Sequence, residues 1–137
     1  MEYAIGIGLA LLAGLLMSWT GMDRDKAAYA VILVVIASLY ELFAVMGAST
    51  AALTMELFPT TIFIGLAVWG FRHSLWWLVA GLVGHGVYDA LHPAMFINPG
   101  VPEWWPMFCL SYDVTAGLYL ACRLRGGLLA SGSRSPA

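Results

Sequence analysis

Five stretches of about 20 mostly apolar residues follow one another along the chain, at roughly 4–21, 27–48, 52–71, 75–92 and 106–123. A helix needs about 20 such residues to cross the ~30 Å hydrocarbon layer of a bilayer. Only 10% of the 137 residues are charged and 61% are hydrophobic, whereas soluble domains carry roughly 25% charged residues. Because no soluble fold of this size can bury so much apolar surface, the sequence predicts an all-α integral membrane bundle of five transmembrane helices.

Short polar segments separate the predicted helices. Residues 22–26, which include Asp23, form a charged turn, residues 47–50 a small polar corner, and residues 72–74 a second charged turn in which Ser74 is placed to cap the next helix. Four prolines lie from Pro93 to Pro106, which predicts a loop over this whole segment. We expect residues 1–125 to form a single transmembrane domain and residues 126–137 to be a disordered cytoplasmic tail.

All six cations fall on one side of the predicted bundle. They are Arg24, Lys26, Arg72, Arg123, Arg125 and Arg134. Because cytoplasmic loops are enriched in Lys and Arg, this distribution places the N-terminus outside and the C-terminus in the cytoplasm. Six cations against eight anions give no basic surface, so we expect no nucleic-acid partner.

Six ionisable residues lie within the predicted spans: Glu41, Glu56, His85, Asp89, His92 and Asp113. An ionisable side chain at the centre of a bilayer costs about 2.5–3.5 kcal/mol on insertion scales and usually has a function. At a rise of about 1.5 Å per residue, all six fall in the outer half of the membrane. His85, Asp89 and His92 also share one helix face, since the spacing i, i+4, i+7 covers only about 60°.

The charge balance of these residues favours a bound cation, because no Lys or Arg lies at the same depth and the carboxylates must be either protonated or neutralised. Two imidazoles with several carboxylates suit catalytic zinc or non-haem iron better than calcium or magnesium. We therefore predict a divalent metal site, with zinc favoured and iron as the alternative. His85, Asp89 and His92 are the expected core ligands. Asp113 and Glu56 complete the coordination or act as catalytic proton-transfer residues.

Two features of this prediction stay open. The inventory of four carboxylates and two histidines equals that of di-iron carboxylate proteins, but those use two Glu-x-x-His motifs, whereas this chain has a single Asp89-x-x-His92. Glu41 faces the site, a lipid headgroup or another subunit, and the sequence does not choose among these positions.

The segment from Gly84 to Pro93, Gly-His-Gly-Val-Tyr-Asp-Ala-Leu-His-Pro, resembles a family of small bacterial membrane proteins catalogued as a domain of unknown function. The resemblance extends to residues 56–59, to the proline-rich loop and to residues 108–113, and covers roughly the C-terminal two thirds of the chain. It implies a multi-pass protein of the bacterial inner (cytoplasmic) membrane, without implying an activity. The ligand types also resemble those of intramembrane zinc hydrolases of the ceramidase and adiponectin-receptor type, although those proteins have seven spans.

These observations predict a metal-dependent membrane enzyme that hydrolyses a lipid-like ester or amide. Bound zinc would lower the pKa of its water to ~7, and Asp113 or Glu56 would serve as general base or acid. With iron, the corresponding reaction is oxidation of a hydrophobic compound. The alternative is a non-enzymatic accessory subunit of a larger membrane complex. The expected partners are the lipid bilayer, a hydrophobic or lipid-like substrate, and either further copies of the chain or a larger membrane complex. An ion channel is disfavoured because the inner half of the spans is apolar.

Overall fold

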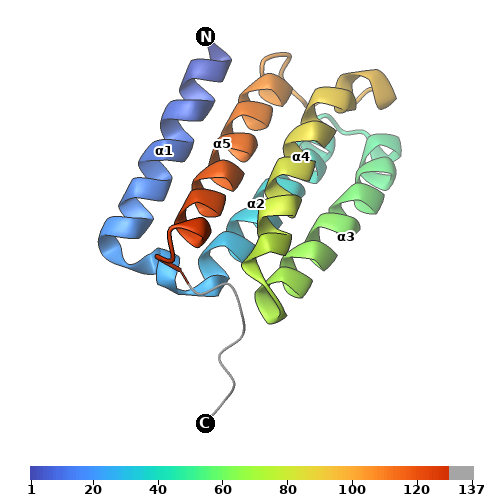
Figure 1. The fold of residues 1–137 in the computed structure, drawn as a ribbon. Helices are drawn as coiled ribbons and strands as arrows, with labels where there is room; N and C mark the ends of the chain where they lie inside the picture. Colours follow the sequence, from blue (N-terminus) through green and yellow to red (C-terminus); the bar gives the residue numbers. More distant parts are fainter. Residues whose placement is uncertain (130–137) are drawn as a thin grey trace.

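The computed structural model of the protein describes residues 1–129 and is an all-α bundle (Figure 1). Within these residues there are five α-helices and no β-strand. The helices are α1 (Glu2–Thr20), α2 (Lys26–Met46), α3 (Thr50–Arg72), α4 (Leu75–Met95) and α5 (Trp105–Arg125), with a 3₁₀ turn, η1, at Met22–Arg24. The five predicted helices are therefore confirmed, and each end lies within three residues of its expected position. Most of the predicted tail, residues 130–137, lies outside the described residues.

Polar residues in the turns determine where three of the helices begin. The side chain of Asp25 accepts a hydrogen bond from the backbone N–H of Ala27 (3.0 Å), and that of Ser49 accepts one from Ala52 (3.1 Å). Ser74 caps α4 as the sequence predicts, through the N–H of Trp76 (3.4 Å). Each cap satisfies one of the N–H groups that the first helical turn leaves without a partner.

Three of the helices, α1, α2 and α3, are long and apolar enough to cross a membrane. Helices α4 and α5 have 21 residues each, but they carry four of the six ionisable residues of the predicted site. The outer surface of the bundle is apolar, and large side chains such as Leu12, Leu15, Val31, Phe58 and Trp69 are more than half exposed. Such a surface is suited to contact with lipid rather than water, so the structure is that of a membrane protein.

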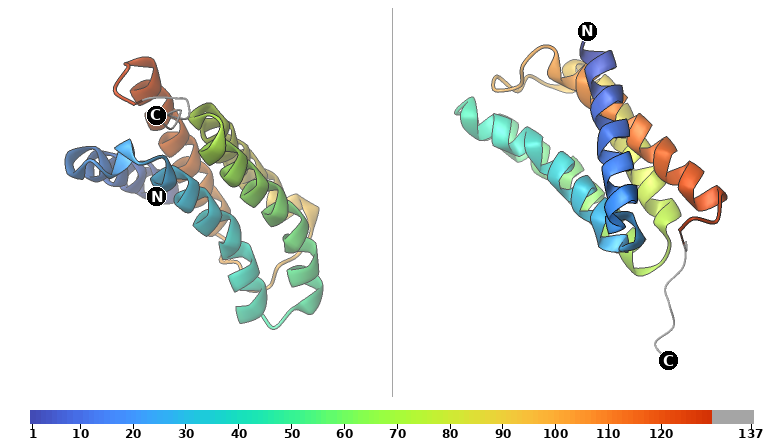
Figure 2. Two further views of the ribbon diagram at one scale, coloured as in Figure 1. Left: turned by 90° about the horizontal axis from the view of Figure 1, so that it is seen from below. Right: turned by 90° about the vertical axis from the view of Figure 1, so that its left-hand side faces the viewer.

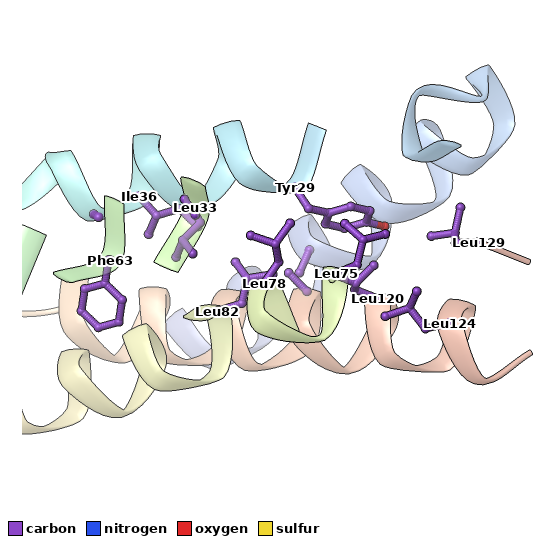
Figure 3. Packing of buried hydrophobic residues seen from close by; sticks show 14 residues of the cluster. Tyr29, Leu33, Ile36, Phe63, Leu75, Leu78, Leu82, Leu120, Leu124 and Leu129 are labelled. Atoms are coloured by element: carbon purple, nitrogen blue, oxygen red, sulfur yellow. The ribbon is translucent and has the colours of Figure 1, made fainter. Parts of the chain in front are cut away.

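The helices pack in the order α1, α5, α4, α3, α2, with α4 making a smaller contact to α2. Figure 2 shows that the α2–α3 hairpin diverges from α1 and α5 toward the end of the molecule that carries the N-terminus. The hydrophobic core occupies the other, narrower part of the bundle (Figure 3). Its largest fully buried members are Tyr29, Leu33, Leu75, Leu78, Leu82 and Leu120. The wide end of the bundle is therefore left for polar residues.

The segment after His92 differs from the prediction. Helix α4 continues through Pro93 to Met95, so the loop comprises residues 96–104, and Pro106 lies in the first turn of α5. Proline is tolerated inside apolar helices because neighbouring groups can satisfy the carbonyl that it leaves without a partner. In the first turn of a helix the missing N–H removes no helical hydrogen bond.

Loop 96–104 packs closely against the C-terminal end of α2. A Cβ atom on Gly100 would clash with the carbonyl oxygen of Phe43, and one on Gly47 would lie 2.5 Å from the backbone nitrogen of Gly100. The side chain of Asn98 donates a hydrogen bond to the carbonyl of Tyr40 (3.0 Å). Two glycines therefore allow the loop to seat on α2 and to place Asn98 inside the bundle.

We predict that Gly100→Ala lowers the free energy of unfolding by about 1–3 kcal/mol, because the added methyl group meets backbone that cannot move without displacing the loop. Thermal unfolding of the detergent-solubilised protein measures the effect. Gly8→Ala is the control, since a Cβ there meets no atom within 4 Å, and it should be neutral or stabilising. Equal destabilisation by the two variants would contradict the close packing of loop 96–104 against α2.

Candidate metal centre

Three buried side chains from α4 and α5 meet in the wide half of the bundle. His85 and Asp89 lie one turn apart on α4, and Asp113 lies on α5; they are 1%, 0% and 0% exposed. The Nδ1 atom of His85 lies 2.6 Å from Asp113 Oδ2 and 3.3 Å from Asp89 Oδ2. One ligand atom from each residue lies within 4.8 Å of the other two, so this group could hold a metal ion.

Two carboxylate oxygens of this group lack a hydrogen-bond donor. They are Asp89 Oδ2, whose contact with His85 does not have hydrogen-bond geometry, and Asp113 Oδ1. A buried polar atom without a partner destabilises a protein by about 1–3 kcal/mol. The cations of the described residues lie near the opposite ends of their helices, at positions 24, 26, 72, 123 and 125. A bound cation would give these two carboxylate oxygens a partner, and the three residues lie close enough together to hold one.

Glycine at position 86 lets α5 approach α4 where the two acids meet. A Cβ there would lie 3.0 Å from Val114 Cγ2 and 3.2 Å from the carbonyl oxygen of Leu110. Close approach through small residues is the usual way in which membrane helices pack. Because Gly86 has no side chain, α5 comes close enough to α4 for Asp113 to reach His85.

Two of the predicted ligands, His92 and Glu56, lie together but outside this group of three. Glu56 on α3 is 0% exposed and accepts hydrogen bonds from Tyr88 Oη (2.7 Å) and Asn98 Nδ2 (2.8 Å). His92 Nε2 lies 2.7 Å from Glu56 Oε1. Both oxygens of Glu56 therefore have donors, in contrast to the carboxylates of Asp89 and Asp113. We call Glu56, Tyr88, His92 and Asn98 the Glu56 group.

Tyr40 on α2 connects the two groups. Its hydroxyl donates a hydrogen bond to Asp89 Oδ1 (2.8 Å), and its ring stacks on that of His92 with 4.1 Å between the ring centroids. Its carbonyl accepts the hydrogen bond from Asn98. Sequence reasoning did not single out Tyr40 or Asn98 as central, because any helical bundle contains tyrosines and the context of Asn98, next to proline and glycine, is typical of a turn. Glu41, whose role the sequence left open, is partly exposed.

A third polar network, which the sequence did not indicate, lies at the opposite end of the bundle. Asp23 in η1 is 1% exposed, and its Oδ2 atom accepts hydrogen bonds from Ser18 Oγ (2.6 Å) and Arg123 Nη2 (2.8 Å). The hydroxyls of Ser18 and Tyr119 lie 2.7 Å apart. This network joins α1, η1 and α5.

Two cavities border the polar groups. One is an apolar groove of about 290 Å³ between α2 and α5, whose lining includes Leu39, Cys109 and Asp113. The other, of about 490 Å³, lies between the C-terminal end of α4 and loop 96–104, and its lining includes His92 and Asn98. The group of His85, Asp89 and Asp113 thus lies beside an apolar groove, whereas the Glu56 group borders a more polar cavity.

Comparisons of the chain with protein families, with curated proteins and with solved structures found no match. What the site can do therefore follows from its own residues and their geometry.

Proposed function

We propose that the protein is a membrane metalloprotein that holds a divalent metal ion between His85, Asp89 and Asp113. The observation that carries this proposal is the pair of buried carboxylate oxygens that lack a donor beside an imidazole. One imidazole and two carboxylates leave coordination positions open, as in catalytic rather than structural zinc sites. We propose zinc first and iron second, because an imidazole stands beside the two carboxylates.

The proposed topology has all five helices crossing the bilayer, with the N-terminus outside and the C-terminus in the cytoplasm of a bacterial inner membrane. In support, η1, the end of α3 and the end of α5 gather at one end of the bundle (Figure 1) and carry Arg24, Arg72 and Arg123. Glu2 and Glu103 lie at the other end. An excess of Lys and Arg marks the cytoplasmic side of membrane proteins, so the metal candidate belongs to the outer half.

The proposed reaction is hydrolysis of a lipid-like ester or amide: water attacks the carbonyl carbon, the acyl C–O or C–N bond breaks, and the products are a carboxylic acid and an alcohol or amine, which takes up a proton from the water. A bound metal supplies a Lewis acid and an activated water near neutral pH. His85, Asp89 and Asp113 would hold the ion, and Tyr40 orients Asp89 through a hydrogen bond to Oδ1, the other carboxylate oxygen. His92, held by Glu56, borders the more polar cavity rather than the group of three.

Metal analysis of the purified protein tests the proposal. Wild-type protein from zinc- or iron-supplemented cells should contain about one equivalent of metal. His85→Ala and Asp113→Asn should each lower the metal content about tenfold or more, because a ligand is lost from a site of three. Two variants serve as controls. Asp23→Asn removes a buried acid at the opposite end of the bundle, and Glu41→Gln removes an acid in the same half as the proposed metal site. Both should keep the metal. Asp113→Asn should also abolish hydrolysis of a fluorogenic acyl ester.

Metal-free wild-type protein would contradict the proposal. If such protein also copurifies with a large membrane complex, the accessory-subunit function replaces the enzyme. Metal that survives in both His85→Ala and Asp113→Asn would place the ion elsewhere.

A further inference from the structure

The groove between α2 and α5 opens on the lipid-facing surface of the bundle. The backbones of α2 and α5 stay apart, since α2 packs on α3 and α5 packs on α1 and α4. Side chains from both helices line the groove, among them Val35, Ile36 and Leu39 of α2 and Phe108, Cys109 and Asp113 of α5. Val35 is 53% exposed, so one edge of the groove faces the surroundings of the protein.

The lining of this groove is apolar except for a few positions on α5. Asp113 is the one ionisable carboxylate among the lining residues, and its Oδ1 atom is one of the two donor-free oxygens of the metal candidate. The groove therefore runs from the lipid-facing surface to the wall formed by Asp113, a residue of the proposed metal site that is itself 0% exposed.

Hydrocarbon is the material that fits this groove in a bilayer. Water is not available at this depth to fill it, and an empty space would forfeit dispersion contacts along its whole lining. Lipid tails are as apolar as leucine, so a tail can enter without an energetic penalty. A volume of about 290 Å³ lies at the lower limit of the ~300–1,000 Å³ that small-molecule pockets span. This size suits one acyl chain and is too small for another helix.

We propose that the α2–α5 groove binds a single acyl chain of a lipid from the leaflet on the N-terminal side and brings the carbonyl group at its end to Asp113. The inference rests on the proposed function in one respect, because it makes the bound lipid the substrate of the metal site. The substrate class is then a membrane lipid with a long-chain ester or amide, attacked at the bond that joins the chain to the rest of the molecule.

Photolabelling tests the groove without relying on activity. The protein is placed in nanodiscs of phosphatidylethanolamine and phosphatidylglycerol with a trace of phosphatidylcholine that carries a diazirine in its acyl chain, and adducts are mapped by mass spectrometry. Labelling of Ile36 and Cys109 should exceed that of Leu12 and Leu15, lipid-facing residues of α1, by about fivefold, because a bound chain stays near its pocket.

Val35→Trp fills the edge of the groove and should reduce labelling of Ile36 and Cys109 by about fivefold. The matched control is Val68→Trp, because Val68 is 52% exposed and lines a different apolar cavity, of about 430 Å³, between α2 and α3. The control should leave labelling of the α2–α5 groove unchanged. Leu39→Trp is a second groove-filling variant, so that the test still stands if Val35→Trp misfolds.

Groove labelling no stronger than that of α1, or unchanged in both groove-filling variants, overturns the inference. So does a disulfide between two copies of the chain, formed on oxidation through Cys109 or at position 36 in Ile36→Cys, since it would assign the groove to a dimer contact. Metal content is measured on the same samples. An unlabelled groove in metal-loaded protein removes the lipid inference alone, whereas a labelled groove in metal-free protein keeps acyl-chain binding and removes the proposed enzyme.

Discussion

Glu56→Ala is expected to lower the free energy of unfolding by about 3 kcal/mol or more, because it removes the common acceptor of three donors, one on half-buried Tyr88 and two on buried side chains. Tyr88 Oη, Asn98 Nδ2 and His92 Nε2 all lie within 2.8 Å of its carboxylate. The three losses will not simply add, since Asn98 keeps its second acceptor, the carbonyl of Tyr40. The loop should nevertheless detach more readily from the bundle.

Thermal unfolding and limited proteolysis measure this effect. In Glu56→Ala, cleavage within residues 96–104 should become faster, and the melting temperature should fall. Glu41→Ala is the matched control, an acid of the same half that is partly exposed, and it should change stability by less than about 1 kcal/mol. If the two variants melt alike, the Glu56 group does not hold the loop and its carboxylate has another role.

Arg123→Ala is expected to destabilise the opposite end of the bundle by about 3–5 kcal/mol, because it leaves a buried carboxylate without its counter-charge. Arg123 Nη2 lies 2.8 Å from Asp23 Oδ2, and the Asp23 side chain is 0% exposed. Without Arg123, the Asp23 carboxylate would keep the hydrogen bond from Ser18 Oγ. Loss of the arginine should also loosen η1, which the pair ties to α5.

The control for this variant is Arg125→Ala, two residues further along α5. Arg125 is exposed and lies over the ring of Trp76 at 5.9 Å from its centroid, so its removal should change stability by less than about 1 kcal/mol. The double variant Asp23→Asn with Arg123→Ala should be more stable than Arg123→Ala alone, because the buried charge is gone. Additive effects of the two changes in a double-mutant cycle would show that the two residues are not coupled.

The helices could be predicted because apolar runs and polar turns alternate clearly along the chain. The error at Pro93 has a physical origin. Proline removes one helical hydrogen bond and crowds the preceding turn, but a helix in an apolar bundle continues where neighbouring groups satisfy the freed carbonyl. Packing against other elements decides this, and it cannot be read from a single sequence. Tertiary contacts likewise decide that Leu129, in the predicted tail, is buried against the core.

The candidate site could be predicted in part. The spacing of His85 and Asp89 and the depth of Asp113 indicated residues that the structure brings together. The same reasoning grouped His92 with them, but the seven-residue step from His85 is a rise of about 10 Å along the helix. Residues on one helix face therefore need not reach the same ion, and His92 contacts Glu56 on α3 instead.

The network around Asp23 could not be predicted from the sequence, for a different reason. The partners Asp23 and Arg123 are 100 residues apart in the chain. Gly21 ends α1 with a positive φ of 79°, a conformation that glycine adopts without strain. The chain then turns back and buries Asp23 against α5. A charged turn in the sequence gives no sign of which of its acids faces inward.

The position of α5 in the chain has a consequence for biogenesis. Both the metal candidate and the Asp23 network close through this helix, which follows the other four in the sequence. Ribosomes release a chain from its N-terminus, so His85, Asp89 and Asp23 emerge before their partners exist. A nascent chain that stalls before residue 105 therefore has His85 without Asp113 and Asp23 without Arg123, and this distinguishes an incomplete molecule chemically from a finished one.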